Sequence, residues 1–557
     1  MNVTVRIAGA AGQGVQTLGD ILARSVFRTG LYLHGEMSYH SRIRGGENAF
    51  TLRIGDSPVL ATETKADLLV ALNAEMLVLY RPAVREGGVV LTDEGVGEPG
   101  DGAVRLPAGR LARDELKLPI AAGVVLLGAA ARLLGLEQER VSNAIRSAFG
   151  DRAEPNLRAL ALGYDQVPDR RWRLPPPQFQ AGEAMLLTGG QAVGAGAIAA
   201  GCRFLAAYPM TPGTPVMEFL AGHAARYGIL VEQAEDEIAA INMALGASYA
   251  GARALVTTSG GGFALMVEGL SLAGMIETPV VVHLGQRPGP ATGLPTRTGQ
   301  ENLLFALHAG HGEFPRYLVA PTDPADAFYL TMKAFEVAEK HQVPAIVLTD
   351  QFLVDSYAVV PALDPARVPV RDHLLPVEEL NRMGRYERFA VTESGISPRA
   401  LPGVSEKLVL VDSDEHDAYG RITEDLAIRR AMVEKRLRKA DGMREEISPP
   451  EIYPAGSLRG KRVLLGWGST YGAIREAVEK LGDGYAHVHL RELWPLRTEE
   501  LRRVWAEAEE VVLVEGTATG QLGALIAGET GLRPHRFVPR YDGRPFTAED
   551  IIAEVER

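Results

Sequence analysis

Short apolar runs alternate with stretches of helical period in the first part of the chain. Strands are predicted at Val3 to Ala8, Ala49 to Ile54, Leu68 to Ala71 and Val89 to Leu91, with a helix from about Thr17 to Thr29. Strands that alternate with helices favour a parallel or mixed sheet with helices packed on its faces.

The same alternation returns from Gly182 and again from Lys461. The strands there are unbroken runs of Val, Leu and Ile, typical of sheet buried on both faces. Helices are predicted at Gly190 to Ala200, Glu235 to Ala250 and Gly262 to Ala273, and others begin at Pro215, Thr470 and Thr498. One short strand is predicted to end at Tyr208. Further strands are predicted at Ile229 to Gln233, Ala254 to Thr258, Pro279 to Leu284, Arg462 to Gly468, Ala486 to Leu490 and Val511 to Val514. We therefore expect an α/β protein with three α/β domains.

Two stretches break this pattern. Asp151 to Pro177 loses its period and runs into three consecutive prolines, which predicts a linker. Asp364 to Pro454 is charged and rich in proline and arginine, which predicts a connector that wraps over other domains without a core of its own. The predicted division is an α/β domain at 1–175, a linker at 176–181, a second α/β domain at 182–363, the connector at 364–455 and a third α/β domain at 456–557.

Composition narrows the class of protein. The 557 residues carry 58 basic and 70 acidic side chains, a net charge of −12, so the basic field that nucleic-acid binders need is missing. The lone Cys202 can form neither an internal disulfide nor an iron–sulfur site, and the first residues do not resemble a signal peptide, which together indicate a cytoplasmic location. The apolar stretch Leu118 to Leu136 contains Pro119 and Arg132, so we expect a buried helix and no membrane span.

A glycine-rich turn, Gly9-Ala-Ala-Gly12-Gln-Gly14, follows the first predicted strand. Glycines there allow close backbone approach, and the amides that start a helix can hold an anion. The order GxxGxG differs from the dinucleotide motif GxGxxG, so even with Glu36 at a suitable distance NAD binding is disfavoured against a tight turn or a site for a phosphate-bearing ligand. Arg44 adds a cation to such a site or belongs to a solvated turn.

Two motifs in the second α/β region carry candidate chemistry. Tyr208-Pro-Met-Thr-Pro-Gly-Thr-Pro215 presents the hydroxyl of Thr211 from a proline-stiffened loop at the carboxyl end of a strand. Glu232-Gln-Ala-Glu-Asp-Glu237 opens a helix, where acids commonly act as dipole partners. Glu237 differs because buried-type positions follow it, and a buried glutamate needs a partner or a task.

Two loops follow these motifs. One is a second glycine-rich loop, Thr257-Thr-Ser-Gly-Gly-Gly262, and the other is the proline-rich stretch Gly285 to Thr296. Arg287 follows a buried strand, where a guanidinium held in one orientation can bind a carboxylate through two parallel hydrogen bonds. On the residues alone, a surface salt bridge explains Arg287 equally well.

The motifs of the second region, in their order, resemble the α subunit of 2-oxoacid:ferredoxin oxidoreductases. They are Tyr-Pro-Met-Thr-Pro from Tyr208, Glu-Asp-Glu-Ile-Ala-Ala-Ile-Asn from Glu235, Thr-Thr-Ser-Gly-Gly-Gly-Phe-Ala-Leu-Met from Thr257 and Gln-Arg-Pro-Gly-Pro-Ala-Thr-Gly-Leu-Pro-Thr from Gln286. The resemblance covers nearly the whole chain: the first glycine loop with Ser41-Arg-Ile-Arg-Gly-Gly is similar to the family's γ domain, the motifs from His311, Gly395 and Glu415 to its middle, and those from Gly466 and Gly520 to its C-terminal domain.

This resemblance implies a γ-like domain, a pyrimidine-binding thiamine diphosphate domain and a transketolase C-terminal-like domain. It implies that Glu237 is the catalytic residue, which bonds the aminopyrimidine ring of thiamine diphosphate and favours its imino tautomer. Thr211 and Arg287 match the family's substrate-binding residues. The cofactor would be bound by Glu237, Thr211, Gly260 and Gly261.

The resemblance also implies a partner chain. Thiamine enzymes hold the diphosphate through Mg²⁺ on a Gly-Asp-Gly motif and a later Asn, but here no asparagine follows Asn381, so Gly482-Asp-Gly484 is expected to be a turn. A separate β subunit would supply the Mg²⁺–diphosphate site and the [4Fe–4S] cluster in an (αβ)₂ heterotetramer, with no metal site on this chain. The loop formed by Gly9, Gly12, Gly14 and Arg44 is the candidate coenzyme A or anion loop.

The implied reaction is the coenzyme A-dependent oxidative decarboxylation of a 2-oxoacid, with electrons passed to ferredoxin. The motifs from Gln286 and His311 look most like those of 2-oxoglutarate or broad 2-oxoacid enzymes, while pyruvate or branched-chain specificity stays open. A non-catalytic assembly subunit would be expected to lose Glu237, Thr211 or Arg287, and all three are present.

Overall fold

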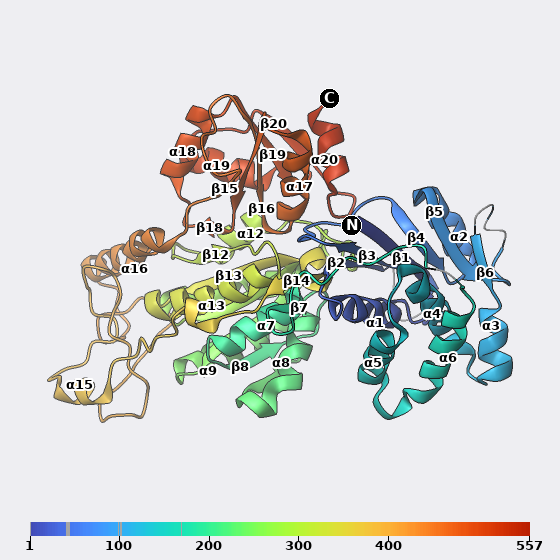
Figure 1. The fold of residues 1–557 in the computed structure, drawn as a ribbon. Helices are drawn as coiled ribbons and strands as arrows, with labels where there is room; N and C mark the ends of the chain where they lie inside the picture. The colour runs from blue at the N-terminus through green and yellow to red at the C-terminus, as the bar shows by residue number, and fades with distance from the viewer. Residues whose placement is uncertain (1, 40–44, 98–99, 101–102, 169) are drawn as a thin grey trace. The chain divides into compact units, whose positions relative to one another are not determined.

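The computed structural model describes residues 2–39, 45–97, 100, 103–168 and 170–557. The chain divides into two compact units, one formed by 1–188, 355–363 and 547–557 and the other by 189–354 and 364–546. The strands among the described residues form three sheets, of eight, seven and five strands, with helices packed against them (Figure 1). The predicted α/β class with three α/β domains is confirmed.

The first unit is built on a mixed sheet of order β6-β5-β4-β1-β3-β2-β14-β7. Strands β1, β4, β5 and β6 pair in parallel, whereas β3, β2, β14 and β7 pair antiparallel. The antiparallel half gives no support to a dinucleotide-binding domain, whose sheet is mostly parallel. The strands are β1 (Asn2–Ala11), β2 (Tyr32–Tyr39), β3 (Gly45–Gly55), β4 (Ala66–Ala71), β5 (Val84–Asp93), β6 (Ala103–Leu106), β7 (Ala184–Thr188) and β14 (Tyr357–Pro361).

Helices cover both faces of this sheet. The short helix α2 (Ala74–Tyr80) packs Met76 and Leu77 on one face, and the other face carries α1 (Val15–Phe27), α4 (Ala122–Leu134), α5 (Gln138–Phe149) and α6 (Glu154–Asp165) (Figure 1). The unit also contains α3 (Ala108–Arg110) and α20 (Ala548–Val555). Helix α4 is almost wholly buried, as predicted, and no helix among the described residues is long and apolar enough to cross a membrane.

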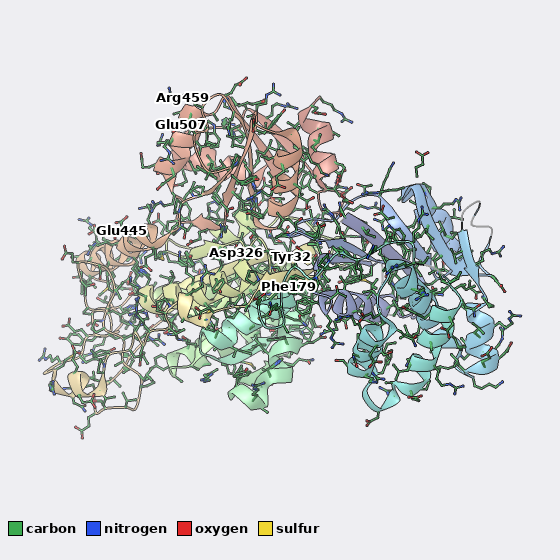
Figure 2. The ribbon with its side chains drawn as sticks, viewed as in Figure 1. Tyr32, Phe179, Asp326, Glu445, Arg459 and Glu507 are labelled. Carbon is green, nitrogen blue, oxygen red and sulfur yellow. The ribbon has the colours of Figure 1, made fainter. Side chains whose placement is uncertain are left out.

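The predicted linker after residue 151 is wrong in its first half. Helix α6 occupies that stretch and buries Ala159 and Leu160 in the core of the unit. The proline-rich stretch beyond it is anchored, because the Phe179 ring packs edge-on against Tyr32 with 5.4 Å between ring centroids (Figure 2) and the Gln178 amide donates to the Gly30 carbonyl at 2.7 Å.

The domain boundaries also differ from those predicted. Strand β7 pairs with β14, from Thr188 opposite Tyr357 to Ala184 opposite Pro361, and β14 joins β2. Both ends of the predicted second domain therefore belong to the sheet of the first unit. This pairing joins strands that lie far apart in the chain, which no local pattern of residues records.

The second unit contains a sheet of order β18-β12-β13-β11-β10-β8-β9, parallel except for the edge strand β18. Its strands are β8 (Cys202–Ala207), β9 (Leu230–Gln233), β10 (Arg253–Ser259), β11 (Val280–Gln286), β12 (Tyr317–Val319), β13 (Pro344–Asp350) and β18 (Glu492–Trp494). The helices are α7 (Gly189–Ala199), α8 (Thr214–Tyr227), α9 (Glu237–Tyr249), α10 (Gly260–Leu265), α11 (Val267–Met275), α12 (Leu303–His308), α13 (Pro324–His341) and α14 (Gln351–Asp355). The single helix predicted at Gly262 to Ala273 is divided between α10 and α11.

The third sheet, of order β15-β17-β16-β19-β20, lies in the same unit and shares its apolar core with the seven-stranded sheet. Its elements are β15 (Glu451–Tyr453), β16 (Arg462–Trp467), β17 (Tyr485–Leu490), β19 (Glu510–Glu515) and β20 (Arg536–Pro539), with α17 (Tyr471–Leu481), α18 (Thr498–Glu507) and α19 (Gln521–Thr530). The Gly-Asp-Gly motif is the turn between α17 and β17, as expected.

The connector is more ordered than its sequence predicts. It contains α15 (Val377–Arg382) and the 21-residue helix α16 (Leu426–Glu446), and a small apolar cluster forms around Leu380 and Tyr386. The predicted absence of a core is therefore wrong. Helix α16 escaped prediction because its buried face includes Lys435, Arg436 and Lys439, so the apolar period of an amphipathic helix is missing.

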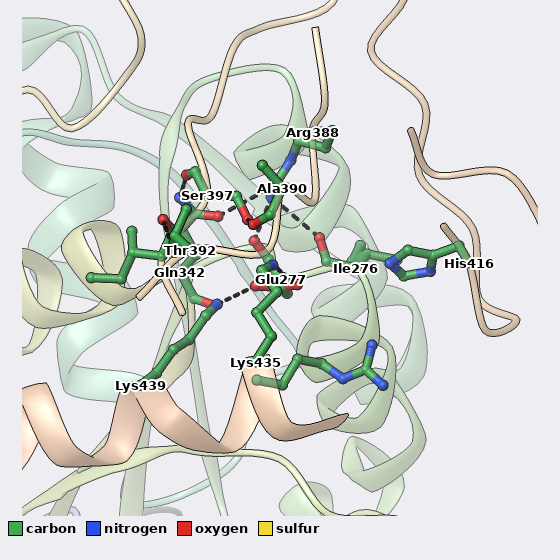
Figure 3. Close-up of polar contacts among 12 residues, drawn as sticks. Ile276, Glu277, Gln342, Arg388, Ala390, Thr392, Ser397, His416, Lys435 and Lys439 are labelled. Atoms are coloured by element: carbon green, nitrogen blue, oxygen red, sulfur yellow. Dashed lines mark hydrogen bonds and ion pairs between the residues drawn. The ribbon is translucent and has the colours of Figure 1, made fainter. Parts of the chain in front are cut away.

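Buried charges hold α16 against the rest of the second unit (Figure 3). Glu277, 1% exposed, accepts from Lys435 Nζ at 2.6 Å and lies 2.5 Å from Lys439 Nζ, while Arg388 Nη2 donates to the Glu277 carbonyl at 2.7 Å. Burial alone would raise the pKa of Glu277, but Lys439 and Lys435 hold it well below its usual range. Burial lowers the pKa of Lys435 to about 8. This carboxylate is therefore the counter-ion for cations that could not otherwise be buried.

We expect Glu277→Gln to lower the stability of the second unit by ~3–5 kcal/mol, the cost of leaving buried cations without their partner. The measurement is thermal and denaturant unfolding of the full chain, followed by limited proteolysis within the connector. Glu434→Gln, an exposed position on the same helix, is the matched control and should leave the unfolding midpoint unchanged. Equal midpoints for the two variants would show that the cluster does not stabilise the fold.

Candidate functional site

The candidate site lies at the carboxyl edge of three parallel strands. Strand β10 pairs with β8 on one side and β11 on the other, and in this register Ser259 lies opposite Gly285. The loops that follow the three strands therefore leave the sheet together. Thr211 follows β8, the three glycines that open α10 follow β10 directly, and Arg287 follows β11, which is the place where open α/β sheets bind ligands.

Glu237 is the first residue of α9, and its carboxylate points into the protein. Asp236 caps the helix by accepting from the Ala239 amide at 2.8 Å, which leaves Glu237 free of a capping role. Glu237 is 3% exposed, and its Oε1 has no hydrogen-bond partner among the described residues. Burial, with a smaller contribution from Asp236, raises the pKa of this carboxyl. A buried acid in this state is suited to bind or exchange a proton with a ligand.

The three glycines at the start of α10 lie beside this carboxylate, and the last of them packs directly against it. A Cβ at Gly262 would lie 2.3 Å from Glu237 Oε1 and 2.2 Å from Thr258 Oγ1, so only glycine fits there. A Cβ at Gly260 would meet the Asn302 amide at 2.8 Å, whereas one at Gly261 has only the Ala291 carbonyl, at 3.8 Å. Of the three glycines, Gly262 was not singled out from the sequence, although it makes the closest approach to Glu237.

Two further unpartnered polar atoms lie beside the same loop. Ser259 is fully buried and its Oγ has no hydrogen-bond partner among the described residues, and the solvent-shielded Oδ1 of Asn302 is in the same state. Neither residue was predicted as part of the site. Ser259 could have been found from its position directly before the glycines, but Asn302 is brought to Gly260 only by the tertiary fold.

Arg287 and Thr211 lie in direct contact. Arg287 Nη1 donates to the Thr211 carbonyl at 2.7 Å, while Arg287 Nε is shielded from solvent without a hydrogen-bond partner among the described residues. Burial lowers the pKa of the guanidinium, but arginine keeps its charge in proteins. The bond to Thr211 holds a cation in a fixed orientation at the strand edge, with a donor left for an anionic group.

A buried histidine sets the position of the Thr211 loop. Thr257 Oγ1 donates to the Gly213 carbonyl at 3.0 Å, so its contact of 2.8 Å with His283 must be donated by His283 Nδ1. Burial lowers the pKa of His283 to about 3, so the ring is neutral and its Nε2 accepts from Thr349 Oγ1 at 2.8 Å. This chain of bonds joins the Thr211 loop to three strands of the sheet.

The glycine turn of the first unit is open and ordered. Gly12 and Gly14 have positive φ angles of 94° and 77°, and a Cβ at either would meet nothing within 4 Å. Gln13 holds the turn, because its Oε1 accepts from the Ala10 amide and from Asn73 Nδ2, each at 2.7 Å. Gly9 is packed, since a Cβ there would lie 2.9 Å from the side chains of Leu72 and Val15, and Arg44 lies outside the described residues.

No group of three or more His, Cys, Asp or Glu side chains able to hold a metal occurs in the described part of the chain. Cys202 is fully buried, and burial raises the pKa of its thiol to about 12. The candidate site of the second unit contains an unpartnered carboxylate, an oriented guanidinium and the three glycines of α10. These residues fit an organic cofactor whose ring carries hydrogen-bonding nitrogens, because such a ring would satisfy the Glu237 carboxylate.

Two segments of the chain match models of known protein families. Residues 195–435 match the family model "Pyruvate flavodoxin/ferredoxin oxidoreductase, thiamine diP-bdg", and residues 4–166 match "Pyruvate ferredoxin/flavodoxin oxidoreductase". The site residues fall within the first of these segments, which is a thiamine diphosphate-binding domain.

Similar proteins match along the whole chain. The 2-oxoacid:ferredoxin oxidoreductase α subunit of a Sulfolobus species is 32% identical over 99% of this chain and 96% of its own length. The 2-oxoglutarate oxidoreductase subunit KorA of Mycobacterium tuberculosis is 30% identical over 99% of this chain and 90% of its own. The solved 2-oxoglutarate:ferredoxin oxidoreductase of Magnetococcus marinus, with 2-oxoglutarate, coenzyme A and succinyl-CoA bound, superposes with a TM-score of 0.91 at 30% identity, covering 100% of this chain and 99% of that one. The chain belongs to the 2-oxoacid:ferredoxin oxidoreductases, as an α subunit of that family.

Proposed function

We propose that this chain binds the aminopyrimidine part of thiamine diphosphate and orients a 2-oxoacid, preferably 2-oxoglutarate, for coenzyme A-dependent oxidative decarboxylation with ferredoxin as electron acceptor. The observation that carries the proposal is the Glu237 carboxylate, which is buried beside Gly262 with an unpartnered oxygen. When bound, thiamine diphosphate supplies the carbon nucleophile and electron sink that the decarboxylation of a 2-oxoacid requires.

Each side chain of the site then has a defined part. Glu237 Oε1 accepts a hydrogen bond from, or exchanges a proton with, a ring nitrogen, and its raised pKa eases that exchange. Gly260 and Gly261 are proposed to line the cofactor site, with Gly260 packed against Asn302, and Gly262 leaves room for the Glu237 carboxylate. Arg287 binds the substrate carboxylate, and the Thr211 hydroxyl donates to the neighbouring keto or carboxylate oxygen.

A partner chain is proposed to complete the site. Large apolar side chains that proteins usually bury are exposed on the elements around Glu237, namely Ile238 and Met243 on α9 and Leu265 on α10. Exposed apolar residues beside a functional site are typical of a protein interface. We assign this surface to a β subunit that carries the Mg²⁺–diphosphate site and a [4Fe–4S] cluster, in an (αβ)₂ heterotetramer.

Coenzyme A is proposed to contact the glycine turn of the first unit. Gly12 and Gly14 expose backbone at the start of the 13-residue helix α1, which has no acidic residue in its first turn. Such a start favours the phosphate groups of a ligand. Gly9 shapes the turn, and Arg44 is proposed as a cation that binds the same ligand.

The substrate preference is tested by co-expressing the chain with its β subunit. We expect coenzyme A-dependent reduction of an electron-accepting dye to be fastest with 2-oxoglutarate, slower with 2-oxobutyrate and pyruvate. The α chain purified alone is the control and should be colourless and inactive. A higher kcat/KM for pyruvate than for 2-oxoglutarate would overturn the preference while leaving the 2-oxoacid reaction intact.

We expect Glu237→Gln to reduce turnover by ~100-fold or more, because the amide keeps the shape of the side chain but cannot take up a proton. Glu235→Gln, two residues earlier and exposed, is the matched control and should retain activity. Circular dichroism and the unfolding midpoint check that both variants fold. Near-normal turnover of Glu237→Gln would show that this carboxylate is not the catalytic residue.

The same geometry can be tested from the opposite side of the contact. Gly262→Ala places a methyl group against Glu237 and should lower turnover, whereas Gly222→Ala, at an exposed position of α8 where a Cβ would meet nothing within 4 Å, is the matched control and should keep turnover. Equal loss in both variants would mean that the contact between Gly262 and Glu237 is not what the reaction depends on.

We expect Arg287→Ala to lower kcat/KM for the 2-oxoacid by ~10- to 100-fold, the value of a charge-assisted hydrogen bond to a carboxylate. Most of the loss should fall in KM. Arg287→Lys keeps the charge but not the fork and should lose less. An unchanged KM in Arg287→Ala would show that this arginine does not bind the substrate and only holds the Thr211 loop in place.

A further inference from the structure

The connector contains a second concave site, separate from the residues that carry the proposed reaction. A pocket of about 320 Å³ is lined by Arg385, Tyr386, Lys407, Leu408, Leu410, Tyr419 and Arg421. This volume lies at the lower end of the ~300–1,000 Å³ typical of small-molecule sites. Three short stretches of the connector, which is mostly irregular chain between α15 and α16 (Figure 1), supply the lining.

The charge of this pocket stands out in an acidic protein. Its lining includes three cations and no acid, although the chain has a net charge of −12. Among the residues that the structure describes, Lys407 Nζ donates only to the Gly384 carbonyl, at 3.1 Å, and the Arg421 guanidinium lies 5.5 Å from the centre of the Tyr419 ring. Within the described ranges neither they nor Arg385 form an ion pair with an acidic side chain, so their charge is available to a ligand.

The frame of the pocket is held in place. Tyr386 is 6% exposed, and its hydroxyl donates to the Pro398 carbonyl at 3.0 Å and accepts from the Ala400 amide at 2.8 Å. The backbone around Arg421 is fixed by Asp417 Oδ1, which accepts from the Arg421 amide at 3.0 Å. The cations are thus carried by ordered chain, which lowers the entropy lost when a ligand binds.

We propose that this pocket binds a diphosphate group, either free or as part of a nucleotide. Two guanidinium groups and an ammonium match the charge of a diphosphate, and arginine forks suit its oxygen atoms. The Tyr419 ring and the exposed Leu408 provide an apolar wall on which an attached ring can pack. A long irregular segment that nonetheless builds an ordered pocket is more often functional than a simple spacer.

The test is calorimetric titration of the full chain with inorganic pyrophosphate, ADP and citrate at low ionic strength. We expect saturable binding of pyrophosphate at one site, weakened ~10-fold or more in Arg385→Gln/Arg421→Gln, because two charge-assisted contacts are lost. Tighter binding of ADP than of pyrophosphate would identify a nucleotide, and equal binding a free diphosphate. Hydrogen exchange should show protection at 384–386, 407–410 and 419–421.

The matched control is Arg430→Gln, an exposed arginine on α16 that does not line the pocket. It should bind pyrophosphate as the unaltered chain does. Citrate binding as tightly as pyrophosphate would overturn the assignment to a diphosphate, since charge alone would then explain it. Absence of saturable binding, or affinity retained in a folded Arg385→Gln/Arg421→Gln variant, would overturn the site itself.

Discussion

The parallel pairing of β8, β10 and β11 is the constraint on which the proposed site depends. Parallel strands end at the same edge of a sheet, so the loops that carry Thr211, the three glycines and Arg287 must leave it together. The neutral ring of His283 then ties the first of these loops to the sheet through Thr257. The result is a set of polar groups whose positions are fixed before any ligand arrives, which is what catalysis by preorganised groups requires.

Two buried glutamates of the second unit show opposite solutions to the cost of burying a charge. Glu277 is paired with Lys435 and Lys439, and this pairing joins the connector to the sheet that carries the site. Glu237 is nearly as buried but has an oxygen without a partner and a raised pKa. Because an unpartnered buried acid lowers stability, its presence is explained best by a ligand that supplies the missing hydrogen bond.

Much of the fold could be predicted from the chain, because strands buried on both faces are uniform apolar runs and the glycine and proline turns between them are local signals. The elements from Ala254 to Leu284 lie within two residues of their predicted positions, apart from the break at Met266. Helix α16 could not be predicted, since its buried face carries lysines whose counter-ion, Glu277, is distant in sequence. Strands β7 and β14 were not predicted at all, and their residues were placed in the second domain, because their partners in the sheet are not their neighbours in the chain.

The candidate site, like the fold, was predictable from the sequence only in part. The residues by themselves determined the chemical types available: a glutamate ahead of buried positions, a threonine on a stiff loop, an arginine after a strand and two glycine-rich turns. Only the tertiary structure decided that Glu237 faces Gly262 and not Gly261, that Asn302 and Ser259 bring unpartnered atoms to the same loop, and that a neutral His283 positions Thr211. Residue type and local period fix what a side chain can do, but which atoms are left without a partner depends on contacts between distant segments.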